Sequence, residues 1–592
     1  MDIATIYFVL VPIIISLILF CLPEKIKTVS RSLFVAITVF NFIAVCAIFG
    51  KIIFSSVPWD AFGFEYSISI KIYEEILLLI IASFALLSSI FAVGDLKDNP
   101  KAKLFNASMI LALAFANGAI ITNNLIFMLV FIEALAIPFV MMILASANDN
   151  KKLAVKAFAI TAVADLFLML GIGIAFALSD SMSIFDISLK LSSGLEVAAF
   201  VCFVIGAAGK LGVMPFHSWM PEAAEKTSVP FLAFMTTAVE KVLGVYILLV
   251  AMNMFNVKPG APATLVLIAV VIIGALLAAL LSNNQKSFKK MLMYTSISQG
   301  SFIMAAILTA FPVAMAGAVL HLIAHTVYKS ALFYASSITD KVKSSYLSIK
   351  QNLHIFVAFA LAVASFIGIP FFAAFYSKEF IYEGAYAGGE YILLVGFILI
   401  TFFCSSAVLN WFGKIFLNSQ KESFVKDESN LFITLPLIIS GFLSLFLGIF
   451  NNMSLQVVKS FLPIAHASHT NIILLFISLA MLLLALLNFI IGFFSKAQNG
   501  LGFVKNILSF LKINKLDESV AADPYSVALK VYGTFAAASF DFDKAVNKVY
   551  DVVITQSVVK SSDFIKKIHN GDLSRYILWA LLGIAALVLL FI

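Results

Sequence analysis

The sequence predicts an all-α, polytopic membrane protein with about sixteen transmembrane helices of ~20 residues each. Hydrophobic residues occupy 62% of the 592 positions, and only 12% of the positions are charged. A soluble domain of this length would carry roughly twice that share of charge. The apolar residues also form long runs, such as 3–22, 76–93 and 472–493, and the mean hydropathy is +1.06. Each of these runs can cross a hydrocarbon core.

Hydropathy and the short loops between apolar runs place the spans in order along the chain. They are expected at 3–22, 31–50, 73–94, 104–122, 124–146, 153–178, 195–214, 230–252, 263–283, 290–310, 313–338, 353–375, 391–416, 430–450, 470–495 and 575–592. The chain then divides into N-terminal spans (1–103), a first repeat (104–252), a second repeat (253–416), two further spans (417–495), a connection (496–574) and a terminal span (575–592).

Basic residues gather in alternate loops. The loops after the first, third, fifth, ninth and eleventh spans hold the lysine clusters around 25–31, 97–103, 151–156, 286–290 and 341–350. Other loops, such as 122–124 and 383–390, contain no Lys or Arg. The positive-inside rule therefore predicts cytoplasmic basic loops and places both termini outside. The net charge of +7 reports this topology rather than nucleic-acid binding.

The connection 496–574 mixes apolar and polar residues. Its segment Tyr525–Ile568 contains no proline and a single glycine, and valines and phenylalanines recur among lysines and aspartates. This pattern predicts an amphipathic lateral helix along the cytoplasmic membrane surface. Such a helix would extend roughly 60 Å, which favours contact with a neighbouring subunit. The alternative is an interfacial helix that only holds the chain to lipid.

Cysteine usage argues against a cofactor in this chain. Cys21, Cys46, Cys202 and Cys404 stand singly in apolar segments, and no C-x-x-C pair exists. An iron–sulfur cluster, a zinc site or a disulfide scaffold would need grouped cysteines. We therefore expect neither a metal nor a cofactor site here.

Ionisable residues inside apolar runs are the strongest functional signal, because a charge at mid-membrane depth is costly without a polar path or a partner. Glu133 lies in IFMLVFIEALAIPFVMMIL, and Lys210 lies in FVIGAAGKLGVMPFHSWMPEA, five residues before Pro215. The proline predicts a broken helix whose free backbone groups suit an ion site. The proton affinity of a buried lysine depends on whether a carboxylate lies beside it, so a Lys–Glu pair can act as a proton switch. The alternative for Glu133 is a purely structural hydrogen bond.

The segment GAVLHLIAHTVYKSALF carries His321, His325 and Lys329 at four-residue steps. This spacing places all three on one helix face. Histidine exchanges protons near neutral pH, so the stripe suits a proton relay. A metal site would need a third ligand, and the sequence offers no H-E-x-x-H pattern.

A second broken helix is expected at Pro370, which is followed by Lys378. Lys378 could contribute to the row of buried charges or could snorkel at the membrane edge. The remaining candidates in or near apolar runs are Asp165, Glu240, Lys241, Lys289 and Lys290. The two broken helices lie five spans apart, which predicts two five-helix repeats of inverted topology, as in ion transporters.

The motifs in combination resemble the antiporter-like subunits of respiratory complex I, Mrp antiporters and energy-converting hydrogenases. GKLGVMPFHSWMPEA resembles GK-x-x-x-P-x-x-x-W-L-P-x-A, and MLMYTSISQG resembles the LAYSSISQ-G segment. HLIAHTVYKSALF resembles H-L-x-x-H-A-x-x-K-A-L-L-F, PFFAAFYSKEF resembles P-x-x-x-G-F-x-S-K-E, and HNGDLSRYILWALLGI resembles the end of the long members. The resemblance implies a prokaryotic cytoplasmic (inner) membrane protein. It also implies that Glu133 and Lys210 form a pair, that His321, His325 and Lys329 form a central relay, and that Lys378 is the terminal lysine.

The eighth span indicates the branch of the family. Its EKVLGVYIL resembles the EK-L-L-G-I-Y of the hydrogenase branch, and Thr236 stands where the long complex I subunit has a histidine. Ser287 replaces an acidic residue before the lysines of the tenth span. The resemblance thus favours the large membrane subunit of an Ech-type nickel–iron hydrogenase, whose nickel–iron and iron–sulfur centres would lie in partner subunits. Other membrane subunits would contact the lateral helix.

The expected function is proton translocation coupled to electron transfer in those partners. The alternatives are the large antiporter-like subunit of complex I, an Mrp-type Na⁺/H⁺ antiporter subunit, and a purely structural anchor for a peripheral enzyme. Lysines and histidines along the row favour protons over sodium, although Asp165 with Ser and Thr oxygens could serve sodium.

Overall fold

The computed structural model describes most of the chain. The described residues are 6–23, 26–59, 64–146, 150–341, 346–347, 349, 352–417, 424–425, 430–450, 472–494 and 504–511, with 525, 560, 563, 566, 577–583 and 586 towards the C-terminus. The expected lateral helix and most of the terminal span lie outside the described residues, apart from these isolated positions. Residues 577–583 are helical.

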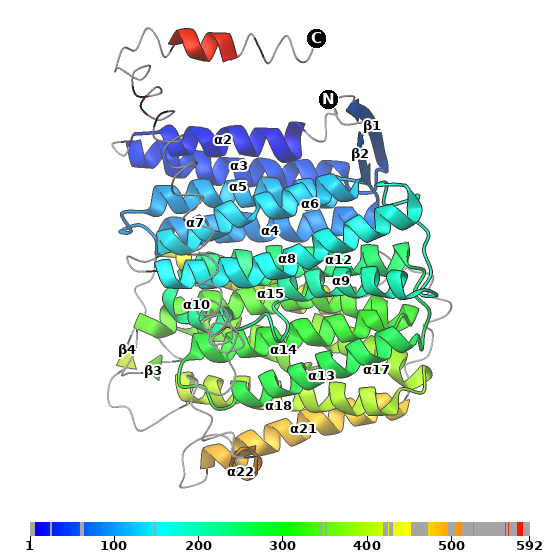
Figure 1. The fold of residues 1–592 in the computed structure, drawn as a ribbon. Coiled ribbons are helices and arrows are strands. Elements are labelled where there is room, and N and C mark those ends of the chain that lie inside the picture. The colour runs from blue at the N-terminus through cyan, green and yellow to red at the C-terminus, as the bar shows by residue number, and fades with distance from the viewer. Residues whose placement is uncertain are drawn as a thin grey trace. The chain divides into compact units, whose positions relative to one another are not determined.

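Long apolar helices dominate the described part of the chain (Figure 1). Twelve of them are long and apolar enough to cross a membrane. The prediction of an all-α, polytopic membrane protein is therefore confirmed, while the count of sixteen spans and the orientation of the termini stay predictions.

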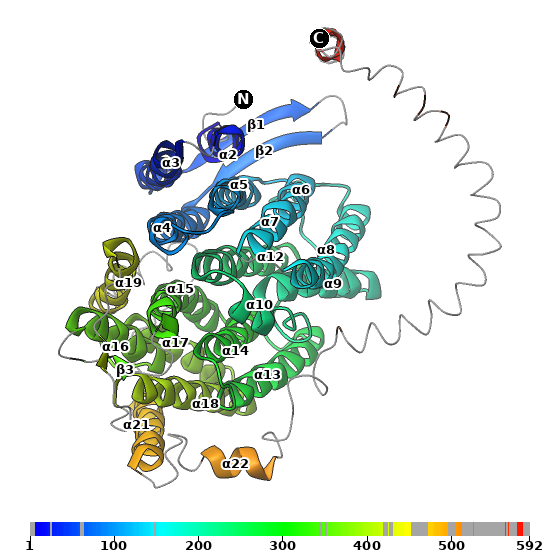
Figure 2. The ribbon, with the colours of Figure 1, turned by 90° about the vertical axis from the view of Figure 1, so that its left-hand side faces the viewer.

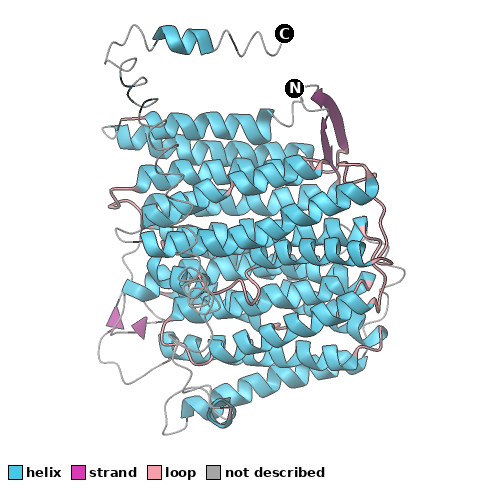
Figure 3. Ribbon diagram, in the orientation of Figure 1, coloured by secondary structure: helices cyan, strands magenta, loops and turns pink. Residues whose placement is uncertain are grey.

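The N-terminal region pairs helices with one β-hairpin. Its elements are η1 (Ile6–Leu10), α2 (Val11–Cys21), α3 (Lys27–Ile48), β1 (Ile53–Trp59), β2 (Phe64–Ile70) and α4 (Ile72–Asp95). The hairpin, which the sequence analysis did not predict, is antiparallel and pairs Ile53 with Ile70 and Trp59 with Phe64. The aromatic and β-branched residues of IFSSVPW and FEYSISI favour strands. Figure 3 shows the hairpin at one end of the helices.

The fourth to eighth predicted spans all form helices. They are α5 (Ala102–Ile121), α6 (Leu125–Ala134), α7 (Ala136–Ser146), α8 (Lys151–Ser179), α9 (Gly194–Leu211), α10 (Met220–Lys226), α11 (Val229–Phe231), η3 (Leu232–Val239) and α12 (Glu240–Met254). The element η3 is a π-helix, a rare form that often occurs at functional sites.

The later predicted spans also form helices. They are α13 (Pro262–Ser282), α14 (Phe288–Leu308), α15 (Pro312–Lys341), α16 (Leu353–Ile367), α17 (Ala373–Ala387), α18 (Tyr391–Phe416), α19 (Leu431–Ile449) and α21 (Ile472–Phe494). Short elements complete the set, namely β3 (Tyr346–Leu347), β4 (Phe424–Val425) and α22 (Val504–Phe510). Figure 2 looks along the helices and shows α5–α12 beside α13–α18.

Both predicted helix breaks are present. α9 ends at Gly212, whose φ is 64°, and α16 ends at Gly368, whose φ is 86°. These left-handed conformations favour glycine, so each helix ends before the proline that the sequence analysis identified. Each break leaves backbone carbonyls at the end of a half-helix without intrahelical partners. The inverted relation of the two repeats stays a prediction.

The helix α15 joins the two groups of helices. Its Thr326 hydroxyl donates to the Thr237 carbonyl at 3.5 Å, and its Ser330 hydroxyl donates to the Ala233 carbonyl at 3.3 Å. Both carbonyls belong to the π-helix η3. The polar face of α15 is thereby held against the end of the first group.

Close packing of α8 on α9 depends on glycine. A Cβ added at Gly209 would overlap the Cβ of Ala164, and a Cβ added at Gly206 would lie 2.8 Å from Leu168 Cβ. Small residues of this kind let membrane helices approach closely. We expect Gly209→Ala to destabilise the protein by about 1–3 kcal/mol through overpacking, measured as a lower melting temperature in detergent.

The matched control is Gly173→Ala on the partner helix α8, because nothing lies within 4 Å of a Cβ added there. Its melting temperature should match that of the wild type. Equal melting temperatures for the Gly209 and Gly173 variants would contradict the packing argument.

Candidate functional site

A buried ion pair connects α8 with α9. The Lys210 ammonium lies 2.8 Å from the Asp165 carboxylate, and their side chains are only 4% and 3% exposed. The sequence analysis had ranked Asp165 as a secondary candidate. Burial in a low-dielectric interior strengthens the attraction and makes the loss of either partner costly.

Glu133, the expected partner of Lys210, lies elsewhere. Its side chain is exposed, one residue before the end of α6, and among the described residues it forms no ion pair with Lys210. It interacts with Asp165 and Lys210 only as a more distant charge. Asp165, rather than Glu133, therefore makes the direct contact with Lys210, and a functional pairing of Glu133 with Lys210 stays a prediction. Glu133 thus places one carboxylate on the otherwise apolar exposed surface of α6 and α7.

The two carboxylates should respond differently to neutralisation. Asp165→Asn is expected to destabilise the isolated chain by about 3–5 kcal/mol, because it leaves the buried Lys210 without its counter-charge. Glu133→Gln is expected to change its stability by less than about 0.5 kcal/mol. Thermal unfolding of both variants in detergent checks this difference. Equal destabilisation would instead support Glu133 as the partner of Lys210 that the sequence analysis expected.

Glu240 and Lys241 lie where η3 passes into α12. Glu240 is 4% exposed and Lys241 is fully buried. Glu240 interacts electrostatically with Lys210. The Lys241 ammonium donates to the carbonyl of Leu211, the last residue of α9. A cation at the C-terminal end of a half-helix complements both its free carbonyls and its dipole.

The polar stripe of α15 is buried at every position. The Lys329 ammonium donates to Thr295 Oγ1 at 2.7 Å and to the Leu292 carbonyl at 3.1 Å. His325 Nε2 lies 3.5 Å from Ser296 Oγ. Electrostatic interactions link Lys241 with both His325 and Lys329. The stripe therefore continues the row from the first group of helices.

His321 makes two short hydrogen bonds. Its Nε2 lies 2.9 Å from Gln299 Oε1, and its Nδ1 lies 2.9 Å from Ser377 Oγ. A neutral imidazole donates with one nitrogen and accepts with the other. His321 thus connects α15 to Gln299 of α14 and to Ser377 of α17.

Lys378 is buried among the helices, and its depth in the membrane stays a prediction. It is 5% exposed, and its ammonium donates to the Phe366 carbonyl at 2.7 Å, next to the end of α16. The Phe366 ring lies between two ammonium groups, 4.7 Å from Lys329 Nζ and 5.9 Å from Lys378 Nζ. An aromatic face attracts cations at such distances. Lys378 therefore occupies the second break as Lys241 occupies the first.

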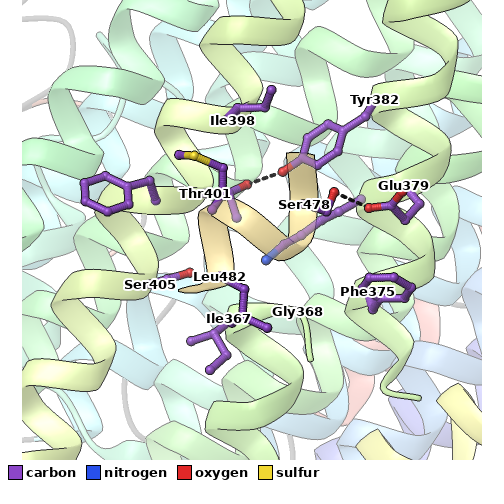
Figure 4. Close-up of a pocket in the computed structure, with 13 residues that line it drawn as sticks. Ile367, Gly368, Phe375, Glu379, Tyr382, Ile398, Thr401, Ser405, Ser478 and Leu482 are labelled. Carbon is purple, nitrogen blue, oxygen red and sulfur yellow. Dashed lines mark hydrogen bonds between the residues drawn. The ribbon is translucent and has the colours of Figure 1, made fainter. Parts of the chain in front are cut away.

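Lys378 lines a small cavity, and Figure 4 shows that Glu379, Tyr382 and Ser478 also line it. The volume that the centre of a water molecule can occupy in this cavity is about 20 Å³, which is enough for about one water. Tyr382 and Thr401 share a 2.7 Å hydrogen bond in its wall, and Ser478 of α21 donates to Glu379. α21 therefore covers the second break with a polar contact.

The last two candidates lie near the start of α14, away from the row. Lys290 pairs with Glu225 of α10 at 3.2 Å, and Lys289 is half-buried. The neighbouring Glu222 pairs with Lys226 at 2.8 Å and with Lys156 at 3.6 Å. These partly exposed ion pairs tie α8, α10 and α14 together.

The row has a defined order. Interactions run from Asp165 and Lys210 through Glu240, Lys241, His325 with Lys329, and His321 to Lys378. Two acidic and six basic groups with hydroxyl and amide partners can hold and pass protons. Sequence reasoning did not identify Thr295, Ser296, Gln299 and Phe366 as contacts of the row, although the SISQG motif contains two of them.

Two proteins similar to this chain are subunits of NADH–quinone oxidoreductases. The chain is 24% identical to NADH-quinone oxidoreductase subunit N of Desulforudis audaxviator, covering 65% of this chain and 83% of that protein. It is 27% identical to NADH-ubiquinone oxidoreductase chain 5 of Trichophyton rubrum, covering 65% of this chain and 60% of that protein. Neither match spans the whole of this chain.

Solved structures share the fold. The Mrp complex from Dietzia aligns with a TM-score of 0.74 at 18% identity, over 99% of this chain and 62% of that one. An archaeal membrane-bound sulfane sulfur reductase aligns with a TM-score of 0.69 at 19% identity, over 100% and 99%. Respiratory complex I from Thermus thermophilus aligns with a TM-score of 0.68 at 18% identity, over 82% and 100%.

A family profile described as "NADH:quinone oxidoreductase/Mrp antiporter, TM" matches residues 122–405. This range begins just before α6 and ends within α18, and it includes every residue of the buried row. Residues 122–405 are therefore similar to the transmembrane domain described for NADH:quinone oxidoreductases and Mrp antiporters, and the chain is antiporter-like over that stretch.

Proposed function

We propose that this chain is the proton-translocating subunit of a membrane-bound redox complex. The observation that carries the proposal is the row from Asp165 to Lys378, which passes through both broken helices and is buried throughout. Burying this many ionisable groups costs several kcal/mol each unless they are paired or used. A purely structural anchor has no use for such a row.

The proposed step begins at the Asp165–Lys210 pair. A charge change in a neighbouring subunit shifts the pair, changes the proton affinity of Lys210, and passes the effect through Glu240 and Lys241. The histidines and Lys329 then relay a proton towards Lys378. The exposed carboxylate of Glu133 suits a position facing a neighbouring membrane subunit, since lipid would disfavour it.

We further propose that the parent complex is an Ech-type energy-converting hydrogenase, with its nickel–iron and iron–sulfur centres in partner subunits. The EKVLGVYIL segment of α12, which supplies Glu240 and Lys241, supports this choice because it resembles the EK-L-L-G-I-Y of the hydrogenase branch. The alternatives are complex I and an Mrp-type antiporter. Purification of the intact complex through a tag on this chain discriminates them: hydrogenase subunits are expected to co-elute, and a quinone-reductase module or Mrp subunits alone would overturn the assignment.

Transport by the purified complex tests the ion. Reconstituted in proteoliposomes and driven by its electron donor, the complex is expected to change the internal pH in sodium-free buffer. Proton movement that occurs only with added sodium, together with uptake of radioactive sodium, would overturn proton translocation. Electron transfer with no ion movement would favour the structural anchor.

A further inference from the structure

A basic pocket lies away from the row, where α2 ends and α3 and α5 begin. The residues that line it include Lys27, Ser30, Arg31, Lys97, Lys103 and Asn106. Its volume is about 460 Å³, counted to the open mouth. It lies among the basic loops, at the end of the bundle that the sequence predicts to be cytoplasmic.

Two cations of this pocket, Arg31 and Lys103, are held in place, whereas the Lys97 side chain is 61% exposed and lies 4.0 Å from the Asp98 carboxylate. Arg31 donates to the Lys97 carbonyl at 2.8 Å, and Lys103 donates to the Leu22 carbonyl at 2.7 Å. A guanidinium has five donors and an ammonium has three, so both groups keep donors for a ligand. Four of the lining residues are cationic, and no acidic residue is among the described lining residues.

Buried polar groups complete the site. Ser30 is 6% exposed and Asn106 is 5% exposed. The Asn106 side-chain oxygen has no hydrogen-bond partner among the described residues, although it is buried. The amide can rotate to present its donors to an anion, because its two ends are nearly isosteric. Asn106 lies in the first turns of the 20-residue helix α5, whose N-terminal amides and dipole also favour negative charge.

The surface beside the pocket is apolar. Ile18 on the last turns of α2 is 42% exposed, and Val29 on the first turn of α3 is 55% exposed. Leu17 and Ile14 continue the exposed face along α2 at 55% and 53%. A ligand with an anionic phosphate and hydrocarbon chains fits both parts, since the phosphate matches the cations and the chains match the exposed helices.

We propose that this pocket binds the phosphate headgroup of an anionic phospholipid whose acyl chains lie along α2 and α3. Arg31 and Lys103 contact the phosphate, Lys27 and Lys97 surround it, and Asn106 donates from below. The site is separate from the ion row and does not depend on the proposed function.

The test uses the purified full-length chain in detergent, titrated with phosphatidylglycerol and followed by native mass spectrometry of the lipid adducts. Phosphatidylglycerol is expected to bind at least about tenfold more tightly than phosphatidylcholine. Arg31→Gln should weaken its binding roughly tenfold. Lys27→Gln, whose side chain lies at the pocket mouth, should weaken it about fivefold.

Lys286→Gln is the matched control, because it removes one exposed positive charge from another basic loop outside the pocket. It should change binding by less than about twofold. A loss equal to that of Arg31→Gln, or equal binding of phosphatidylcholine, would overturn the proposal. Displacement of the lipid by excess inorganic phosphate would also overturn it and would indicate a site for a free anion. If Arg31→Gln fails to fold, the comparison of Lys27→Gln with Lys286→Gln tests the proposal. Equal lipid binding by these two variants would overturn it.

Discussion

Replacing Lys210 by methionine is expected to abolish redox-driven ion transport by the complex. Lys210 lies at the start of the row, 2.8 Å from Asp165 and in electrostatic contact with Glu240. Methionine has a similar length without the charge, so the proton switch is removed while the space stays filled. Transport measured as a pH change in proteoliposomes should fall to the level of empty vesicles.

Stability separates the chemical role of this pair from its structural one. Lys210→Met alone leaves Asp165 buried without its partner and should cost about 3–5 kcal/mol. The double variant Asp165→Asn/Lys210→Met removes both charges and should recover most of that loss. It should still fail to transport. Full transport in the stable double variant would show that the pair only holds α8 against α9, and would favour the anchor function.

Lys190→Met provides the control for removing a lysine. Lys190 is exposed in the loop before α9, outside the row. Its replacement should leave transport and melting temperature unchanged. Loss of transport in this variant would mean that the net charge of the chain, rather than the position of Lys210, controls pumping.

The features that sequence reasoning predicted best are local ones. The stripe of His321, His325 and Lys329 follows from four-residue spacing within one helix, and all three are fully buried. The breaks at Pro215 and Pro370 follow from backbone chemistry, although Gly212 and Gly368 end the helices. Such features need no knowledge of which helices are neighbours.

The partner of Lys210 could not be predicted in the same way. Glu133 and Asp165 are both single carboxylates in apolar runs, and the sequence gives neither one a distance to Lys210. Because α8 packs closely on α9 at Gly209, Asp165 of α8 is the carboxylate that lies beside Lys210. The contact of Lys241 with Leu211 is also tertiary, because it depends on a helix break in one span and a π-helix before another.

The second large effect is expected from Gly300→Ala in α14. A Cβ at this position would lie 2.5 Å from the Lys241 ammonium and 3.0 Å from the Leu211 carbonyl. It would therefore occupy the space in which the ammonium meets the end of α9. The flexible lysine side chain moves more easily than the backbone, so the ammonium is expected to leave the carbonyl.

Losing this charged hydrogen bond at the middle of the row should slow proton transport roughly ten- to hundredfold, since such bonds contribute about 1.5–3 kcal/mol. No ionisable group is removed, which distinguishes the variant from a charge deletion. Gly173→Ala on α8 introduces the same methyl group into open space and should transport at the wild-type rate. Normal transport by Gly300→Ala would mean that protons pass without the Lys241–Leu211 contact, and Lys210 would then have to connect to the α15 stripe by another route.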